Sequence, residues 1–452
     1  MVTTILWFRR DLRLSDHPAL IEATRAARGG GSVVPVFCLD ERLWNPAGAN
    51  RRAFLVGCLR ALDADSGGHL IIRAGDPVRV LPALAEEVGA AEVFVSADFA
   101  PYGAARDRAV ETALAAAGRS LRRVGSPFAV DPGTVRSGSG VPYKVFTPYS
   151  KAWAAHGWPR PRPATASVPW AARVPTDGIP LVPVSGARLP EPGEAAAKRA
   201  ARRFWDIHLD RYDEQRNDPG ADATSRLSPY LKWGCLHPRQ LLHKLGAATA
   251  ERAFRSELCW REFYADVLHH RPETARQAFA SRMAGIEVDG RGTAPRFDAW
   301  REGRTGYPIV DAGMRQLVAE GWMHNRVRML VASFLVKDLH LDWTRGARHF
   351  MAHLVDGDLA SNQHGWQWVA GTGTDAAPYF RIFNPVTQGE RFDPRGTYVR
   401  RWVPELAAVP DQYVHHPWDD PNGPPAGYPA PMVDHAEERE EALRRYAAVG
   451  SR

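Results

Sequence analysis

Cysteine is scarce and scattered in this sequence. Four cysteines occur among 452 residues, and none of them belongs to a C-x-x-C pair. Neither a disulfide framework nor a cysteine-rich zinc site is therefore indicated. Histidines do not repeat at the spacing of zinc ligands either, so we expect no metal centre. Free thiols of this kind fit a reducing cytoplasm, which is the predicted location.

Long hydrophobic runs are also missing. No stretch reaches the roughly eighteen uninterrupted apolar residues of a membrane span. The segment from Met1 to Arg13 contains Arg9, Arg10 and Arg13 without an apolar run behind them, so no export signal is predicted. A dinucleotide fingerprint is absent as well, because no G-x-G-x-x-G string follows the first predicted strand.

The composition is that of a folded soluble protein with more than one domain. Apolar residues make up 44% of the chain and charged residues 24%. The net charge of +7 favours polyanionic partners without identifying one. The number of tryptophans, fifteen, is higher than usual. Large aromatic rings can stack on bases as well as fill a core.

The first part of the chain alternates short β-branched runs with helical stretches such as Arg51–Leu62. The predicted strands are Ile5–Phe8, Val33–Phe37, His69–Ile72 and Glu92–Val95. This order predicts an α/β domain over residues 1–130, with a parallel, Rossmann-like sheet that binds ligands beyond its carboxyl ends.

A segment dense in Pro, Gly and Ser predicts an interdomain linker over residues 131–195. From 196 to 452 the pattern changes to amphipathic helices without convincing strands, which predicts an all-helical second domain. Its predicted helices are Ala195–Tyr212, Pro238–Leu245, Phe254–His269, Ile309–Ala319, Asn325–Leu339 and Ala436–Tyr446.

Hydroxyl groups cluster in Thr224, Ser225 and Ser228, beside Arg226 and directly before Pro229. Proline there predicts a helix start, where backbone amides attract anions. The segment could cradle a phosphate. Taken alone, however, the pattern favours ordinary helix capping.

Glu257 and Trp260 lie three residues apart in the predicted helix Phe254–His269, so a carboxylate shares a face with a flat aromatic ring. That pair would suit a ring-shaped substrate. The alternative is a surface ion pair between Glu257 and Arg261, with Trp260 in the core.

Two further segments combine polar and aromatic residues. In Gly321–Met329, Asn325, Arg328 and Met329 share one side of a helix while Arg326 points elsewhere. In Asp356–Trp368, Asp356 and Asp358 lack the rest of a calcium-loop pattern, so helix capping or pairing with arginine or a ribose is favoured over a metal.

Together these segments resemble the DNA photolyase and cryptochrome family, and the resemblance extends nearly from end to end. The strings that carry it are Leu6–Arg13, Thr224–Leu231, Trp260–Tyr264, Thr305–Pro308, Gly321–Met329, Asp356–Trp368 and Tyr379–Pro385. Within the family the chain looks most like the class I photolyases that act on cyclobutane pyrimidine dimers. The resemblance implies light-driven repair of damaged DNA, single- or double-stranded, by a monomer that carries FAD in its helical domain.

The resemblance also assigns residues to roles. Those expected to bind FAD are Tyr212, Thr224, Ser225, Arg226, Leu227, Ser228, Arg328, Asp356, Asp358 and Asn362. Asn362 is expected at the flavin N5, where an amide can bond a reduced flavin without adding a negative charge. Those expected to hold a flipped dimer are Glu257, Trp260, Asn325, Arg326 and Met329. DNA contacts are expected from Arg216, Arg261, Tyr264 and Gln388.

An antenna pigment is implied on the α/β domain. Arg51, Asp98 and Arg106 are the residues expected there, and their surroundings look more like the 8-hydroxy-deazaflavin type than the methenyltetrahydrofolate type. Trp366 and Trp343 match the first two members of the family's electron-transfer chain. The third position falls near Gly290, where no aromatic residue occurs. Tyr307, Trp300 and Trp322 are candidates for another exit.

Two other functions compete with repair. A blue-light-sensing cryptochrome without repair activity typically needs a long regulatory tail, whereas this sequence ends soon after Tyr446. An oxidoreductase with no role on DNA would need a nicotinamide site, and none is visible in the sequence. We therefore expect a photolyase.

Overall fold

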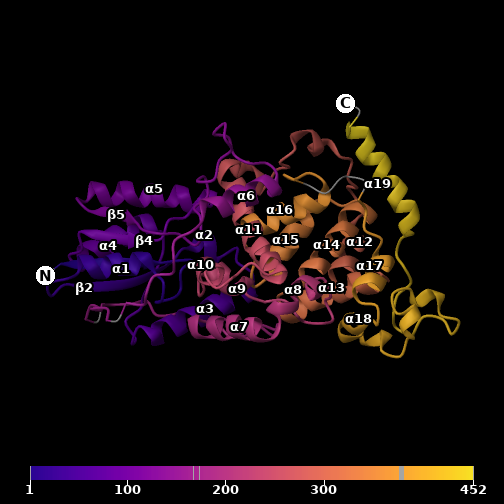
Figure 1. The fold of residues 1–452 in the computed structure, drawn as a ribbon, viewed down its shortest axis with the longest axis horizontal. Coiled ribbons are helices and arrows are strands. Elements are labelled where there is room, and N and C mark those ends of the chain that lie inside the picture. The colour runs from indigo at the N-terminus through magenta and orange to yellow at the C-terminus, as the bar shows by residue number, and fades with distance from the viewer. Residues whose placement is uncertain (1, 166, 173, 376–380, 451–452) are drawn as a thin grey trace. The chain divides into compact units, whose positions relative to one another are not determined.

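A computed structural model describes residues 2–165, 167–172, 174–375 and 381–450 (Figure 1). The described residues form two compact units. The first unit comprises Met1–Ser185, Leu189–Ile207 and Ser225–Pro272, and the second comprises Gly186–Arg188, His208–Thr224 and Glu273–Arg452. Tyr379 and Phe380, which belong to the last string of the family resemblance, lie outside the described residues.

The first unit is built on a parallel sheet, as the sequence predicts. Its five strands follow the order β3-β2-β1-β4-β5. The strands are β1 (Thr3–Phe8), β2 (Ser32–Leu39), β3 (Ile71–Ala74), β4 (Glu92–Val95) and β5 (Ser120–Arg123). On the central strand, Leu6 pairs with Pro35 of β2 and with Phe94 of β4. Because β1 has neighbours on both sides and helices on both faces, its apolar run is buried almost completely.

The edge strand β5 was not predicted from the sequence. Of its four residues, Ser120, Arg122 and Arg123 are exposed and only Leu121 is buried. A polar edge strand has no apolar run by which it could be recognised, and its charged side chains discourage pairing with another chain.

Helices cover the sheet and continue into a helical extension of the first unit. They are α1 (Pro18–Ala26), α2 (Glu41–Trp44), α3 (Ala49–Asp65), α4 (Pro77–Glu87), α5 (Pro101–Ala116), α6 (Phe146–His156), α7 (Glu194–Ile207), α9 (Ser228–Trp233), α10 (Pro238–Leu242) and α11 (Thr249–His270). Several begin with proline, whose fixed φ suits the first helical turn. Helix α6 lies inside the segment predicted as a linker.

The loop after β1 is joined to the last residue of α9 and to the segment that follows it. The amide of Leu12 donates to the carbonyl of Trp233 at 3.1 Å. The buried Arg13 guanidinium donates to the Gly234 carbonyl at 3.0 Å, and Arg239 pairs with the buried Asp16 at 2.7 Å. The first unit is therefore built from distant stretches of sequence, whereas the predicted domain boundaries at 130 and 195 stay predictions.

The second unit is helical, and its described residues contain no strand. Its α-helices are α8 (Tyr212–Gln215), α12 (Ala294–Arg301), α13 (Pro308–Glu320), α14 (Asn325–Ser333), α15 (Trp343–His353), α16 (Leu359–Ala370), α17 (Pro385–Phe392), α18 (Thr397–Trp402) and α19 (His435–Gly450). Short helical turns connect them: η1 (Leu209–Arg211), η2 (Pro272–Ala275), η3 (Ser281–Gly285), η5 (Pro404–Leu406), η6 (Asp411–Tyr413) and η7 (Pro417–Asp419).

One predicted helix differs in its last turns. The pattern predicts a helix over Asn325–Leu339, but α14 ends at Ser333 and the chain continues as a π-helical turn, η4 (Phe334–Asp338). The buried Lys337 in this turn donates to the Arg381 carbonyl at 2.8 Å. The wider turn changes the periodicity, which a 3.6-residue pattern cannot reveal.

Among the residues that the structure describes, no helix combines the length and the apolarity needed to cross a bilayer.

Candidate functional site

Helix α11 of the first unit presents Trp260 as a partly exposed ring. The indole lies face to face with Phe146, with ring centroids 3.7 Å apart and planes 7° apart. Tyr264 tilts against the same indole at 5.3 Å, and Glu257 is also half-buried. Trp260 is therefore not a core residue, and a ring beside a carboxylate remains open to a planar ligand.

Arg261, one residue further along α11, is held by backbone carbonyls. Its guanidinium donates to the carbonyls of Pro127 at 3.2 Å and Leu231 at 3.3 Å. It also lies 4.8 Å from the centre of the Phe128 ring. These contacts tie α11 to two other segments of the first unit, whereas the expected contact of Arg261 with DNA stays a prediction.

Glu262 was not singled out from the sequence. Its buried carboxylate accepts hydrogen bonds from the amides of Ala129 at 2.5 Å and Val130 at 3.1 Å, and from the Trp153 indole at 2.7 Å. Burial nevertheless raises the pKa of Glu262 to about 7, against these donors and Arg261. Glu262 anchors the loop before α6 and α6 itself to α11.

None of the three hydroxyl residues stands at the N-cap of α9, although Ser225 Oγ accepts the Leu227 amide at 3.4 Å. The residue that precedes α9 is Leu227, and it makes no side-chain capping bond. The expectation that capping explains these hydroxyls is therefore wrong for α9. Arg226 has a φ of 49°, in the left-handed region that costs energy for a residue other than glycine. Backbone strain of this kind is common where a chain is shaped around a ligand.

In the second unit, Tyr212 opens α8 and is buried, and the Arg216 guanidinium lies 5.7 Å from the centre of its ring. The Thr224 hydroxyl oxygen is buried without a hydrogen-bond partner among the described residues. A buried hydroxyl left unpaired is costly, so Thr224 fits a ligand with a polar group at this place.

Arg328 of α14 lies beside Asp356, which belongs to the loop between α15 and α16. The Arg328 guanidinium pairs with Asp356 Oδ2 at 2.9 Å, while the buried Asp356 Oδ1 has no partner in the described part of the chain. Asp358 caps α16 by accepting the Ser361 amide at 3.2 Å. The favoured alternatives of helix capping and arginine pairing are confirmed, and the unpaired Oδ1 fits a ligand with hydroxyl or N–H donors.

Asn362, on α16, is buried with its amide turned to the protein. Its Nδ2 donates to the Ala347 carbonyl at 3.1 Å and to Gln363 Oε1 at 2.9 Å. Its Oδ1 accepts no hydrogen bond from any described residue, so the side chain retains one acceptor for a ligand donor.

Arg326 points away from Arg328, as predicted, and lies in a cluster of positive charge. It donates to Asn217 Oδ1 at 2.8 Å and lies 4.4 Å from the centre of the Phe392 ring. Burial lowers the pKa of Arg326, and three other arginines lower it further. We call these four residues the arginine cluster: Arg216, Arg326, Arg381 and Arg391.

Like charges gathered in this way are stabilised by an anion, so the arginine cluster has the chemistry to hold a phosphate group. Arg326, Arg381 and Arg391 have no carboxylate partner in the described chain. Arg381 and Arg391 were missed by the sequence reasoning, since nothing in their spacing links them to Arg326. Three predicted site residues of this unit remain: Asn325 is exposed, and Met329 and Gln388 are half-buried.

Trp366 is buried in the second unit, and Gly346 makes room for it. A Cβ at position 346 would lie 2.1 Å from the Trp366 ring. The rings in contact with Trp366 are Phe350 at 4.9 Å and Trp300 at 6.2 Å between centroids. Trp343 begins α15, and no ring among the described residues contacts it. The segment near Gly290 supplies no aromatic side chain.

The predicted antenna residues lie at the carboxyl end of the sheet and beside it. Arg106 pairs with Asp107 at 2.9 Å and with Asp98 at 3.3 Å, and its guanidinium lies 4.9 Å from the centre of the buried Trp7 ring. Burial would raise the pKa of Asp98, but Arg9 and Arg106 hold it below its usual value. Arg51 is buried on α3.

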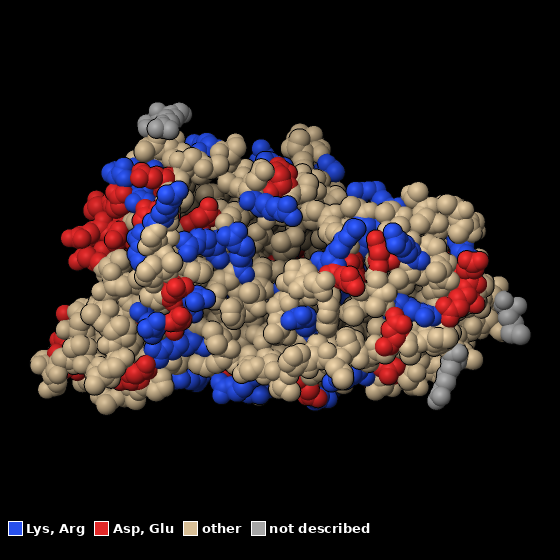
Figure 2. All heavy atoms as spheres, turned by 180° about the vertical axis from the view of Figure 1, so that it is seen from behind, with Lys and Arg blue, Asp and Glu red and all other residues tan. Residues whose placement is uncertain are grey.

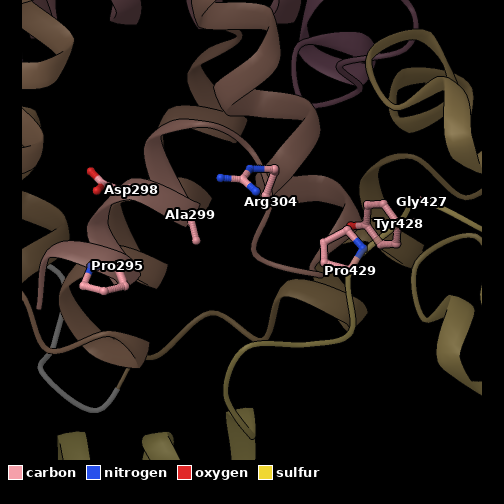
Figure 3. Close-up of a pocket in the computed structure, with 7 residues that line it drawn as sticks. All are labelled: Pro295, Asp298, Ala299, Arg304, Gly427, Tyr428 and Pro429. Atoms are coloured by element: carbon pink, nitrogen blue, oxygen red, sulfur yellow. The ribbon is translucent and has the colours of Figure 1, made fainter.

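A hollow of about 640 Å³ opens on the second unit, and none of its lining residues was predicted as a site residue (Figure 3). It is lined by Pro295, Asp298, Ala299, Arg304, Gly427, Tyr428 and Pro429. Both charged groups are already neutralised, because Asp298 pairs with Arg301 and Arg304 pairs with Glu302. The hollow has no unpaired charge to offer a ligand.

Comparison with known proteins identifies the family. Residues 4–168 match the DNA photolyase family model, and residues 254–448 match the model of the FAD binding domain of DNA photolyase. A deoxyribodipyrimidine photo-lyase of Streptomyces griseus is 42% identical over 97% of this chain and 98% of its own. Another from Agrobacterium fabrum is 40% identical, with 98% of each chain covered.

Solved structures agree with the sequence relatives. A bacterial class III photolyase from Agrobacterium tumefaciens matches with a TM-score of 0.89 and 38% identity, over 100% of this chain and 98% of that chain. A cryptochrome of Synechocystis matches with a TM-score of 0.85 and 28% identity, over 98% and 99%. The parallel α/β sheet and the helical unit are therefore those of a known fold, and the chain belongs to the DNA photolyase family.

Proposed function

We propose that this chain repairs cyclobutane pyrimidine dimers in DNA, using blue light and bound FAD. The observation that carries the proposal is the half-exposed Trp260 ring beside Glu257, in a chain that belongs to the photolyase family. A dimer pairs and stacks poorly in duplex DNA, so it can be flipped out toward such a ring at low cost.

Reduced FAD would supply the chemistry, by lending an electron to the dimer on illumination and recovering it after the ring has split. The residues proposed to hold it are Tyr212, Thr224, Ser225, Arg226, Leu227, Ser228, Arg328, Asp356, Asp358 and Asn362. The unpaired buried oxygens of Thr224 and Asp356 support this assignment.

The dimer would be bound by the chain's own polar and aromatic groups. Trp260 would stack on it, while Glu257 and Asn325 would bond its carbonyl and N–H edges. Arg326 and Met329 complete the proposed pocket residues. Arg216, Arg261, Tyr264 and Gln388 are proposed contacts of the DNA strand, where cations neutralise phosphates.

The finer assignments are also proposals. We propose that the chain is a class I photolyase, although a class III photolyase is among the similar structures. The proposed antenna is 8-hydroxy-deazaflavin, with methenyltetrahydrofolate as the alternative, bound near Arg51, Asp98 and Arg106. We further propose a cytoplasmic monomer that accepts single- and double-stranded damaged DNA.

The test uses purified holoenzyme in its reduced form. DNA with thymine dimers is incubated with it in blue light and in the dark, and the remaining dimers are counted. We expect loss of dimers in the light only. Intact dimers under both conditions would overturn the proposal and favour a light sensor, and the absorption spectrum of the same sample identifies the antenna.

Substitution of Trp260 tests whether this ring takes part in binding the dimer. Trp260→Ala should weaken binding to dimer-containing DNA about tenfold or more, because one base–aromatic stack contributes about 1–3 kcal/mol. Trp44→Ala makes the same change elsewhere in the first unit and should leave binding unchanged. Equal affinity of Trp260→Ala and the parent protein would contradict the role of this ring.

A further inference from the structure

Phe146 forms a two-ring stack with Trp260, and this contact has no role in the proposed chemistry. The two planes are 7° apart with centroids at 3.7 Å, which is the geometry of full stacking rather than of the edge contacts common in cores. Phe146 is the first residue of α6, whereas Trp260 lies in the middle of α11. Both residues belong to the first unit.

The stack leaves only one face of the indole for a ligand. Trp260 contacts three rings among the described residues: Phe146 in parallel, Phe263 at 74° and Tyr264 at 48°. Phe263 and Tyr264 therefore meet the indole at an angle, and Phe146 alone covers a face. Trp260 remains half-exposed in spite of these contacts.

Phe146 is itself held in place by the core. Its ring meets Phe263 at 5.8 Å, and Phe263 is completely buried. Further along α6, Tyr149 is buried against Phe263 at 5.1 Å, and Trp153 donates to Glu262 at 2.7 Å. Helix α6 is thus fixed to α11 at three successive places, so the Phe146 ring cannot swing away without disturbing them.

We propose that Phe146 is a positioning residue for lesion recognition: it backs the Trp260 indole, fixes the plane of that ring and reserves the opposite face for a flipped pyrimidine dimer. This inference rests on the proposed function. A ring that is already ordered loses less freedom when a ligand stacks on it, so the backing ring increases affinity without touching the ligand.

The test compares dark binding of the FAD-loaded protein to two DNA duplexes of identical sequence, one with a single thymine dimer and one undamaged. Phe146→Leu removes the ring but keeps an apolar side chain. We expect about three- to tenfold weaker binding of the dimer duplex, in line with the strength of a stacked aromatic pair. Binding of the undamaged duplex should not change.

Two further variants separate positioning from folding. Phe146→Tyr keeps a ring in the same place and should restore the affinity for the dimer duplex. Phe99→Leu makes the matched change at a ring that makes only edge contacts, with Phe128 at 6.3 Å and His269 at 5.6 Å, and it should leave the affinity unchanged. Thermal unfolding of all three proteins checks that each is folded.

The outcomes distinguish this inference from the function on which it rests. If Phe146→Leu binds both duplexes as the parent protein does, or if Phe146→Tyr fails to restore binding, the positioning role is overturned. If Trp260→Ala also leaves dimer binding unchanged, the proposed function fails at this ring. Weakened dimer binding by Trp260→Ala together with normal binding by Phe146→Leu would overturn the inference alone.

Discussion

At the scale of single residues, Glu262 holds together the segments around Trp260. It carries a buried carboxylate with three donors, two from the backbone of residues 129 and 130 and one from Trp153. Its pKa of about 7 lies well above the ordinary value of 4.5 because burial disfavours the charge more than the donors favour it. The folded protein therefore binds this proton more tightly than the unfolded chain.

This shift predicts a pH dependence of stability. The free energy of unfolding should fall as the pH rises from about 4.5 to about 7, because only the folded state holds the proton in that interval. Glu262→Gln cannot ionise and faces several donors with an amide, so it should lower stability by about 1–3 kcal/mol.

Unfolding midpoints of the parent protein and Glu262→Gln at pH 5 and pH 8 provide the measurement. The difference in stability should be larger at pH 5, where the parent protein retains its protonated carboxyl. A difference that grows toward pH 8 would contradict the assignment.

A second prediction at the residue scale concerns the path by which an electron reaches Trp366 when light reduces FAD. We propose that the electron reaches it through Trp343, so Trp343→Phe should slow photoreduction and leave repair by chemically reduced protein intact. Trp300, whose ring lies 6.2 Å from Trp366, is the alternative route, and Trp300→Phe is compared with Trp343→Phe. Slower photoreduction in Trp300→Phe, with Trp343→Phe unaffected, would assign the route to Trp300.

At the scale of elements, the turn at Thr305 and Gly306, before α13, is held by hydrogen bonds to one buried carboxylate. The buried Asp311 carboxylate accepts from the Thr305 amide and hydroxyl at 2.7 Å each, from the Gly306 amide at 3.1 Å and from the Tyr428 hydroxyl at 2.7 Å. Gly306 has a φ of 79°, and a Cβ there would lie 2.3 Å from the Ala430 carbonyl oxygen. The turn thus joins α13 to the C-terminal segment.

Gly306→Ala should therefore lower the free energy of unfolding by at least about 1–3 kcal/mol, because an alanine there is strained at positive φ and its Cβ also clashes with the backbone. Gly285→Ala is the control, because a Cβ at position 285 meets nothing within 4 Å and the residue has no positive φ. Chemical denaturation measures both variants. Equal stability of the two would show that the C-terminal segment moves aside freely.

The elements that the sequence predicted are those with a local signal. The runs around Ile5 and Val34 are apolar because both faces of the sheet are covered, so they could be recognised without knowledge of the fold. Strand β5 and the π-helical turn after Ser333 have no such signal. The stack of Phe146 on Trp260 could not be foreseen either, because it joins residues far apart in the sequence.

At the scale of the whole molecule, the feature that bears on DNA binding is which surface arginines are paired with carboxylates. On the face shown in Figure 2, basic and acidic side chains are interspersed. The net charge is +7, and the exposed arginines are of two kinds: some are paired, as Arg439 is with Glu440, and others, such as Arg391, form no ion pair with a described carboxylate. We expect the unpaired arginines to contribute more to the attraction of DNA than the paired ones.

This distribution predicts which arginines determine the salt dependence of DNA binding. Arg391→Ala should reduce the slope of log affinity against log salt by about 0.9, the value for one phosphate contact on duplex DNA. Arg439→Ala removes an arginine of α19 that is already paired, and it should leave the slope unchanged. Binding to undamaged duplex at several salt concentrations measures both, and identical slopes would exclude Arg391 from the interface.

The bonds of Arg13 and Asp16 to residues 234 and 239 have a consequence for synthesis of the chain. While the ribosome is still translating the central part of the protein, the loop after the first strand has no partner for a buried guanidinium and a buried carboxylate. A nascent chain released before the end of α11 would expose these groups to chaperones and proteases. Premature termination should therefore yield degradation products rather than a stable α/β fragment.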